Sequence, residues 1–197
     1  MYQPNHAKLR EEHPNPIRQS PLAFKVRRAA PALIPPVAPT PTEFKELSDV
    51  DDQEGLRGNE SRGWNQDPAK VIREAVGKAL VPYYPFAGRL REKAGRKLVV
   101  ECNGEGVLFI EANADVTLDD FGEEIHPPFP CLEELIFDVS GYGGTLDSPL
   151  IIIQVTRLKC GGIILAWRFN HAMADGAGFF QFLSAVAELG RGGQLSV

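Results

Sequence analysis

The sequence has few cysteines, no excess of positive charge and no long hydrophobic run. The three cysteines form no CxxC pair, which argues against a disulfide framework and a cysteine-rich zinc site and is typical of a reducing compartment. The 21 Lys and Arg residues against 26 Asp and Glu give a net charge of −5. Neither nucleic acid nor an anionic membrane is favoured by such a balance. No apolar run approaches the ~18–20 residues of a membrane span. We therefore expect a cytoplasmic protein without nucleic-acid or membrane partners.

The sequence also lacks the signatures of secretion and of two common kinds of hydrolytic site. Its N-terminal residues contain no hydrophobic segment of the kind found in a secretory signal. No G-x-S-x-G motif is present for a serine nucleophile. Three of the four histidines, His6, His13 and His126, lie in Pro-rich or loop-like contexts without the paired spacing of zinc ligands. We therefore expect neither a serine-nucleophile triad nor a metal centre.

Length and proline content set the organisation of the chain. A chain of 197 residues predicts one domain, and 43% hydrophobic residues are typical of a globular protein. Nine of the 16 prolines fall in residues 4–41, so this region cannot form one continuous helix or strand. We interpret residues 1–21 as a disordered extension, 24–28 as a short edge strand and 31–43 as an extended surface segment. The polar segment 45–66, rich in Gly, Asn and Asp, is typical of a loop.

Two helices are predicted from capping residues and apolar spacing. Asp67 can cap a helix whose first position is Pro68, and apolar residues recur at helical spacing over 71–80. A second helix is predicted over 176–189, with Asp175 as its N-cap. Its large apolar residues are predicted to pack in the core: Phe179, Phe180, Phe182 and Leu183.

Two pairs of β-rich segments are interpreted as hairpins. Residues 97–102 and 107–112 flank a Gly/Asn turn at 103–106. Residues 150–155 and 163–169 form the second pair, and both segments are so apolar that both faces of their sheet should be covered. Strands followed by a helix, twice over, predict an α/β fold in which helices pack on a mixed β-sheet.

The second hairpin leads directly to His171, with Asp175 four residues further on. Histidine titrates near neutral pH, which makes it the usual general base, and catalytic groups often follow strand ends that face a helix start. The same short pattern is also typical of a structural histidine beside a helix cap. The spacing alone therefore leaves both interpretations open.

A second motif, Tyr-Pro-Phe-Ala-Gly-Arg, follows the first helix at residues 84–89. Pro85 and Gly88 predict a rigid turn after Tyr84, with one aromatic residue of the motif packed against the core. We expect Arg89 to bind a carboxylate or a backbone carbonyl, and we interpret the motif as structural rather than catalytic.

Taken together, the two motifs resemble the plant BAHD acyltransferases of specialised metabolism. The order Tyr-Pro-x-Ala-Gly-Arg and then His-x-x-x-Asp-Gly is that of the family, and the resemblance is closest to the alcohol-acylating branch similar to benzyl alcohol O-benzoyltransferases. It covers about residues 22–192. The further segments that carry it are 24–28, 39–57, 95–122, 127–135 and 154–162.

The resemblance implies transfer of an acyl group from coenzyme A to an alcohol or amine. Acyl-CoA would be a co-substrate, with no permanently bound cofactor. His171 matches the family's general base, which deprotonates the acceptor hydroxyl as it attacks the thioester. Since thiolate is a good leaving group, neither a covalent intermediate nor a metal is needed. Asp175 and Gly176 match residues that support the shape of the site, and Asn170 and Met173 would lie along the substrate channel.

The resemblance also implies a missing part. The family fold has two α/β domains, each related to chloramphenicol acetyltransferase, and the full-length enzyme is expected to be monomeric. This chain corresponds to the N-terminal domain at residues 22–192, with an apparent internal deletion near 57–67 and a truncated tail at 193–197. The channel face would then be exposed, which favours self-association.

Two alternatives to an active acyltransferase remain open. The first is a catalytically inactive, truncated product that is unstable or only binds a full-length relative. The second is a carrier-protein condensation domain, which shares the His-x-x-x-Asp spacing. The matches at 39–57 and 95–122 argue against this second alternative.

Overall fold

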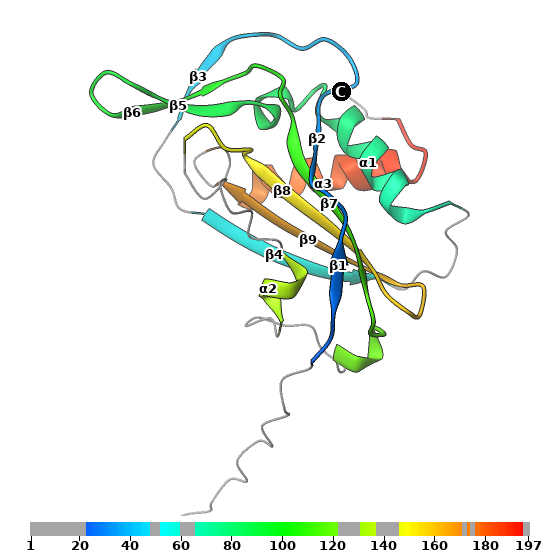
Figure 1. Ribbon diagram of the computed structural model, residues 1–197. Coiled ribbons are helices and arrows are strands. Elements are labelled where there is room, and N and C mark those ends of the chain that lie inside the picture. The colour runs from blue at the N-terminus through cyan, green and yellow to red at the C-terminus, as the bar shows by residue number, and fades with distance from the viewer. Residues whose placement is uncertain are drawn as a thin grey trace, which may run out of the picture.

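The computed structural model shows a mixed β-sheet with helices packed on it and a smaller sheet beside it (Figure 1). The structure describes residues 23–47, 52–59, 66–121, 131–136, 146–170, 173 and 176–194. The strands are β1 (Val26–Arg28), β2 (Ala32–Ile34), β3 (Phe44–Glu46), β4 (Asp52–Asn59), β5 (Arg89–Lys93), β6 (Lys97–Glu101), β7 (Val107–Ala114), β8 (Ile151–Arg157) and β9 (Ile163–Asn170). The α-helices are α1 (Pro68–Ala79), α2 (Leu132–Leu135) and α3 (Gly176–Gly190), with 3₁₀ turns η1 (Tyr84–Ala87) and η2 (Asp119–Phe121).

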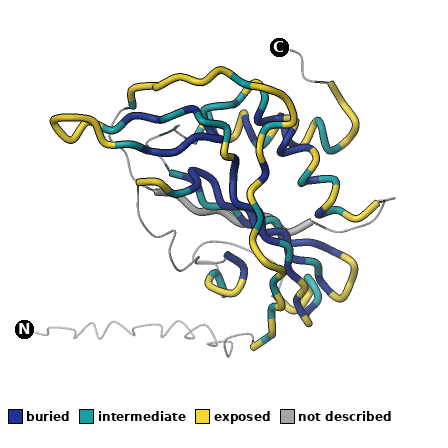
Figure 2. Tube along the Cα trace, turned by 45° about the horizontal axis from the view of Figure 1, so that its top comes forward, coloured by how far each residue is buried: buried dark blue, intermediate teal, exposed yellow. Residues whose placement is uncertain are grey.

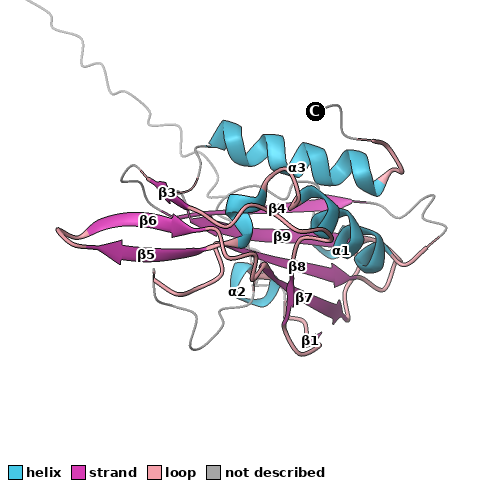
Figure 3. Ribbon diagram, turned by 90° about the horizontal axis from the view of Figure 1, so that it is seen from above, coloured by secondary structure: helices cyan, strands magenta, loops and turns pink. Residues whose placement is uncertain are grey.

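The larger sheet has the order β1-β7-β8-β9-β4, with β2 also paired to β7, and the smaller sheet has the order β3-β6-β5. The larger sheet is mixed because β7 and β8 are parallel and its other pairs are antiparallel. Helices α1 and α3 cover one face of this sheet, and α2 lies on the opposite face (Figure 3). The predicted α/β class, helices on a mixed sheet, is confirmed.

The β8–β9 hairpin forms the centre of the core and confirms the second predicted hairpin. Its register runs from Ile151 opposite Phe169 to Arg157 opposite Ile163. Successive strand residues point to opposite faces, and β8 is buried on both of them apart from Arg157 (Figure 2). The apolar runs are therefore explained by a strand that is covered on both sides.

Helix α1 begins as its sequence predicts. The Asp67 carboxylate accepts a hydrogen bond from the Ala69 amide at 3.3 Å, and proline occupies the first turn. The same carboxylate accepts a hydrogen bond from Arg157 Nε at 2.8 Å, and Arg157 also pairs with Glu111 on β7 at 2.7 Å. The cap therefore joins α1 to the larger sheet.

This joint predicts a difference between two substitutions of Asp67. Asp67→Ala removes both the cap and the ion pair and should cost about 1–2 kcal/mol of unfolding free energy. Asp67→Asn keeps an acceptor for the Ala69 amide and should cost less. Urea unfolding at neutral pH measures both, and equal losses would contradict the capping role.

The pH dependence of the same joint follows from its charges. Hydrogen bonds from the Arg157 guanidinium lower the pKa of Asp67 and the pKa of Glu111 below their ordinary values. A lowered folded-state pKa stabilises the fold above the unfolded pKa, near 4, and that contribution is lost as pH falls through the folded value. Asp67→Asn should therefore flatten the acid limb of the stability curve.

The first predicted hairpin is wrong. Strand β6 pairs with β5 and β3, whereas β7 belongs to the larger sheet, so residues 103–106 cross between sheets. The hairpin partner of β6 is β5, through a turn in which Gly95 has φ 82°. Gly106 has φ 98°, and a Cβ there would lie 2.1 Å from the Ile34 carbonyl oxygen. Gly106 thus lets the segment 103–106 pass close to β2 on its way from the smaller to the larger sheet, instead of turning back as a hairpin.

The N-terminal prediction was right for one strand and wrong for two segments. Strand β1 is the predicted edge strand, with Val26 opposite Ala114. Segment 31–43 is not only a surface segment, because β2 pairs with β7 and Ile34 is buried. Segment 45–66 is not simply a loop, because β3 reaches into it and β4 pairs along the whole of β9. Backbone pairing at the β9 edge forms a strand without any apolar alternation.

Three segments discussed above fall wholly or partly outside the described residues. These are the extension at 1–21, much of the region around the apparent deletion, and the last three residues of the tail. No helix in the part of the chain that the structure describes has the length and apolar character needed to cross a bilayer.

Candidate active site

The candidate site lies where β9 ends and α3 begins. Asn170 is the last residue of β9, and its amide donates to the Leu150 carbonyl oxygen at 3.0 Å. The Met173 amide donates in turn to the Asn170 carbonyl oxygen at 3.0 Å, and α3 begins at Gly176. His171 and Asp175 lie outside the described residues, so their roles remain predictions. Asn170, Met173 and Gly176 define the frame around them.

Met173 packs against the hydrophobic core of the protein. Its side chain is half-buried and packs against the main apolar cluster between the larger sheet, α1 and α3. It also packs against a second cluster that contains Leu90, Cys102 and Leu150, which Tyr84 joins. Apolar contacts therefore fix Met173, which lies midway in the sequence between His171 and Asp175.

Phenylalanines from α3 meet the predicted turn η1, which confirms the packing role of its aromatic residue. Phe86 lies 5.2 Å from Phe182 and 6.4 Å from Phe179, measured between ring centroids. Phe179 stacks on Phe169 of β9 at 3.9 Å. The prediction that Phe180 packs in the core is wrong, since its side chain is 61% exposed. The helical repeat of 3.6 residues turns it away from the face that its neighbour buries.

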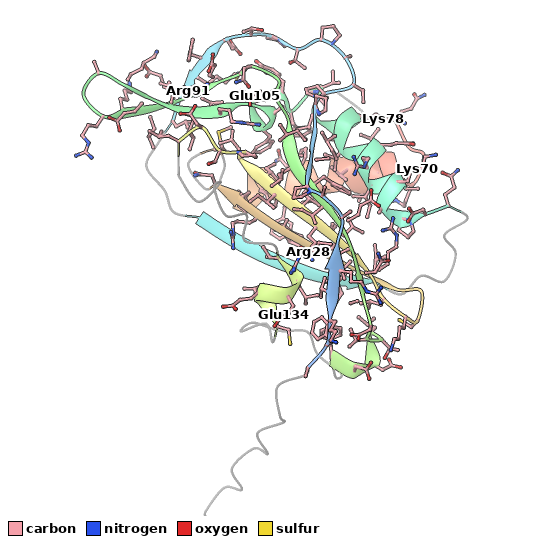
Figure 4. The ribbon with its side chains drawn as sticks, in the orientation of Figure 1. Arg28, Lys70, Lys78, Arg91, Glu105 and Glu134 are labelled. Carbon is pink, nitrogen blue, oxygen red and sulfur yellow. The ribbon has the colours of Figure 1, made fainter. Side chains whose placement is uncertain are left out.

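Arg89 binds carbonyl oxygens and a carboxylate, as predicted. It is buried, and its Nη1 donates to the carbonyl oxygens of Gly88 at 2.7 Å and Gly106 at 2.8 Å. Its Nε lies 3.1 Å from the carboxylate of Glu105, which Figure 4 labels beside the crossing between the sheets. Arg89 therefore ties the end of the 84–89 motif to the connection between β6 and β7.

A polar network on the opposite sheet face was missed by the sequence analysis. Gln154 and Thr156 are buried on β8, and the Gln154 amide donates to the Thr156 hydroxyl at 3.0 Å and to the Glu134 carbonyl oxygen at 3.3 Å. Arg28 donates to the Gln154 side chain and to the backbone of α2 (Figure 4). The signal was a single glutamine directly after three isoleucines in an otherwise apolar segment. The network fixes α2 on the sheet.

The described residues near Met173 offer packing rather than a nucleophile or a metal ligand set. Burial raises the pKa of the Cys102 thiol, which keeps it protonated at neutral pH. Among the described residues no group of three or more His, Cys, Asp or Glu side chains could hold a metal ion. A base placed on this frame would act beside apolar side chains.

A family model and curated relatives match this chain over most of its length. The model of the Transferase family matches residues 60–197. Benzyl alcohol O-benzoyltransferase of Petunia hybrida is 56% identical over 184 residues, which cover 89% of this chain and 40% of the relative. The 13-hydroxylupanine O-tigloyltransferase of Lupinus albus is 57% identical over 180 residues, covering 87% and 40%. The chain thus spans about two fifths of the length of these relatives.

A solved structure shares the fold. Vinorine synthase superposes with a TM-score of 0.67 at 23% identity, covering 88% of this chain and 44% of that one. The described sheets and helices therefore correspond to one part of a larger, two-domain structure.

Proposed function

The chain belongs to the Transferase (BAHD) family, and we propose that it is the N-terminal half of an O-acyltransferase that moves an acyl group from coenzyme A to an alcohol. The observation that carries this proposal is the identity of 56–57% to relatives named for O-acyl transfer, from Petunia hybrida and Lupinus albus. The proposal includes a cytoplasmic enzyme that uses acyl-CoA as a co-substrate and holds no permanent cofactor.

In the proposed mechanism His171 is the general base. It takes the proton of the acceptor hydroxyl as that oxygen attacks the thioester carbonyl. The carbon–oxygen bond forms, the carbon–sulfur bond breaks, and the proton passes from the histidine to the departing thiolate. Asp175 supports the shape of the site, and Asn170 and Met173 lie on the substrate side. The backbone bonds of Asn170 to Leu150 and Met173 support this arrangement, because they fix the strand end that precedes the histidine.

The 197 residues by themselves are proposed to be catalytically silent. Coverage of only 40% of the relatives supports this alternative. Groups that stabilise the developing oxyanion usually supply the largest part of catalysis, and the longer relatives have room for them in their remaining length.

A chimera tests separately the proposed acyl transfer and the proposed inactivity of the isolated chain. Residues 22–192 of this chain replace the matching part of the Petunia hybrida enzyme, and release of free thiol is measured with benzoyl-CoA and benzyl alcohol. The chimera should form ester and release thiol, and the isolated chain should not. A folded chimera without thiol release would contradict the proposed acyl transfer. Histidine-dependent release from the isolated chain would contradict its silence.

A further inference from the structure

We propose that the motif at residues 84–89 positions the turn between β9 and α3. It does so by ring contacts with α3, by an apolar cluster shared with Met173, and by a backbone route from Arg89 to Asn170. The motif lies far from this turn in sequence, between α1 and β5, yet the structure brings the two together. The importance of the motif for catalysis rests on the proposed function, whereas its contacts with α3 are independent of that function.

The contact after the turn is aromatic. Phe86 is buried in η1, and its ring meets Phe179 and Phe182 in the first two turns of α3. Tyr83 adds an edge-to-face contact with Phe182 at 5.7 Å. Such pairs prefer particular ring geometries, so they fix the direction as well as the depth of the helix. The start of α3 is therefore set against η1.

Within the turn, Met173 and the motif share an apolar cluster. The Met173 side chain packs in the cluster that holds Leu90 and Leu150, which Tyr84 of the motif also joins. Leu90 follows the motif directly and is fully buried. A thioether side chain adapts to its surroundings, so the rigid neighbours decide where it lies.

Before the turn, the motif is linked to the end of β9 indirectly, through the backbone of Pro149 and Leu150. Arg89 forms a β-bridge with Pro149, the residue before Leu150. The Leu150 carbonyl oxygen accepts the hydrogen bond from the Asn170 amide, which ends β9. A displacement of the motif would therefore shift the end of β9 through Pro149 and Leu150.

The motif is itself rigid, because hydrogen bonds and close packing hold its backbone in place. The Arg89 guanidinium bonds the carbonyl oxygens of Gly88 and Gly106. A Cβ on Gly88 would lie 2.4 Å from the Glu101 carbonyl oxygen, so the motif presses against β6 at this point. A site is most precise when rigid elements support it. The motif has the rigidity that a positioning element needs.

Phe86 is therefore assigned as a positioning residue that acts through the turn. Misplacing a catalytic group by about 1 Å can cost about 10²-fold in rate. Phe86→Leu keeps an apolar side chain but removes the ring contacts with α3. Its effect should appear at the turn and not only in stability.

The chain offers a clean reporter and a matched control. It contains two methionines, Met1 and Met173, so a methyl spectrum of methionine-labelled protein has two signals, which Met173→Leu assigns. Phe121→Leu is the control, because Phe121 is also buried but belongs to a separate apolar cluster with no contact to Met173. Both variants lose one buried ring.

The expected result is a Met173 methyl shift larger than the linewidth in Phe86→Leu and none in Phe121→Leu, at comparable losses of melting temperature. Ring-labelled histidine spectra should show a changed titration of one histidine, identified by His171→Ala, only in Phe86→Leu. Equal responses in the two variants, or none, would overturn the positioning role.

Two further measurements keep the test decisive. Phe182→Leu removes the partner ring, and it should reproduce the Met173 shift if Phe86→Leu does not fold. In a catalytically active chimera, Phe86→Leu should lower kcat about tenfold or more with little change in KM. A Met173 shift in a chimera that releases no thiol would leave the positioning role intact and contradict the proposed function instead.

Discussion

Replacing His171 with alanine should lower the rate of thiol release by the chimera about 10²- to 10⁴-fold, the usual contribution of a general base. The alcohol would then have to lose its proton to water, which is a far weaker base at neutral pH. Because the base acts in the transition state, kcat and kcat/KM should fall together. Steady-state thiol release with benzoyl-CoA and benzyl alcohol measures both parameters.

His126→Ala is the matched control for this prediction. That histidine lies in a Pro-rich stretch of the sequence, and we expect its removal to leave the rate unchanged. Asp175→Ala should lower activity together with melting temperature, because its proposed role is support. Ester formation that persists in His171→Ala at the parent rate would remove the base assignment and favour the structural histidine beside a helix cap.

The central elements could be predicted because each carries its own local signal. Helix α1 has a capping aspartate and a first-turn proline, and the β8–β9 hairpin consists of two apolar runs. Strand β4 could not, because its polar residues form a strand only when β9 supplies backbone partners. The sheet exchange between β6 and β7 depends on the close approach of Gly106 to Ile34, which no local pattern encodes.

The candidate site divides in the same way. The residue types and spacing of both motifs could be found in the sequence, as could the role of Arg89. Their closeness could not, since α1 and β5 to β8 determine where η1 meets the turn after β9. A motif interpreted as a rigid packing turn acquires a second role from the contacts of Phe86 and Met173.

The rigidity of that motif leads to a large stability prediction for Arg89. Arg89→Leu should cost about 3–6 kcal/mol of unfolding free energy, because two buried carbonyl oxygens lose charged donors at about 1.5–3 kcal/mol each. Gly88 and Gly106 are both buried, so water cannot readily replace the guanidinium. Arg89→Lys keeps the charge but not the fork of donors, and its cost should lie between that of Arg89→Leu and zero. Urea unfolding of the isolated chain measures all three proteins.

Arg91→Leu provides the matched control on the same strand. Arg91, which Figure 4 labels, is more exposed, at 36% of its side chain, and pairs with Glu101 at 2.7 Å and with Asp147. Exposed ion pairs contribute about 0–1 kcal/mol, so this substitution should cost several times less than Arg89→Leu. If the two losses were equal, charge on β5 would be what matters. A loss confined to Arg89→Leu would show that the arginine stabilises the fold by bonding buried backbone at the crossing between the two sheets.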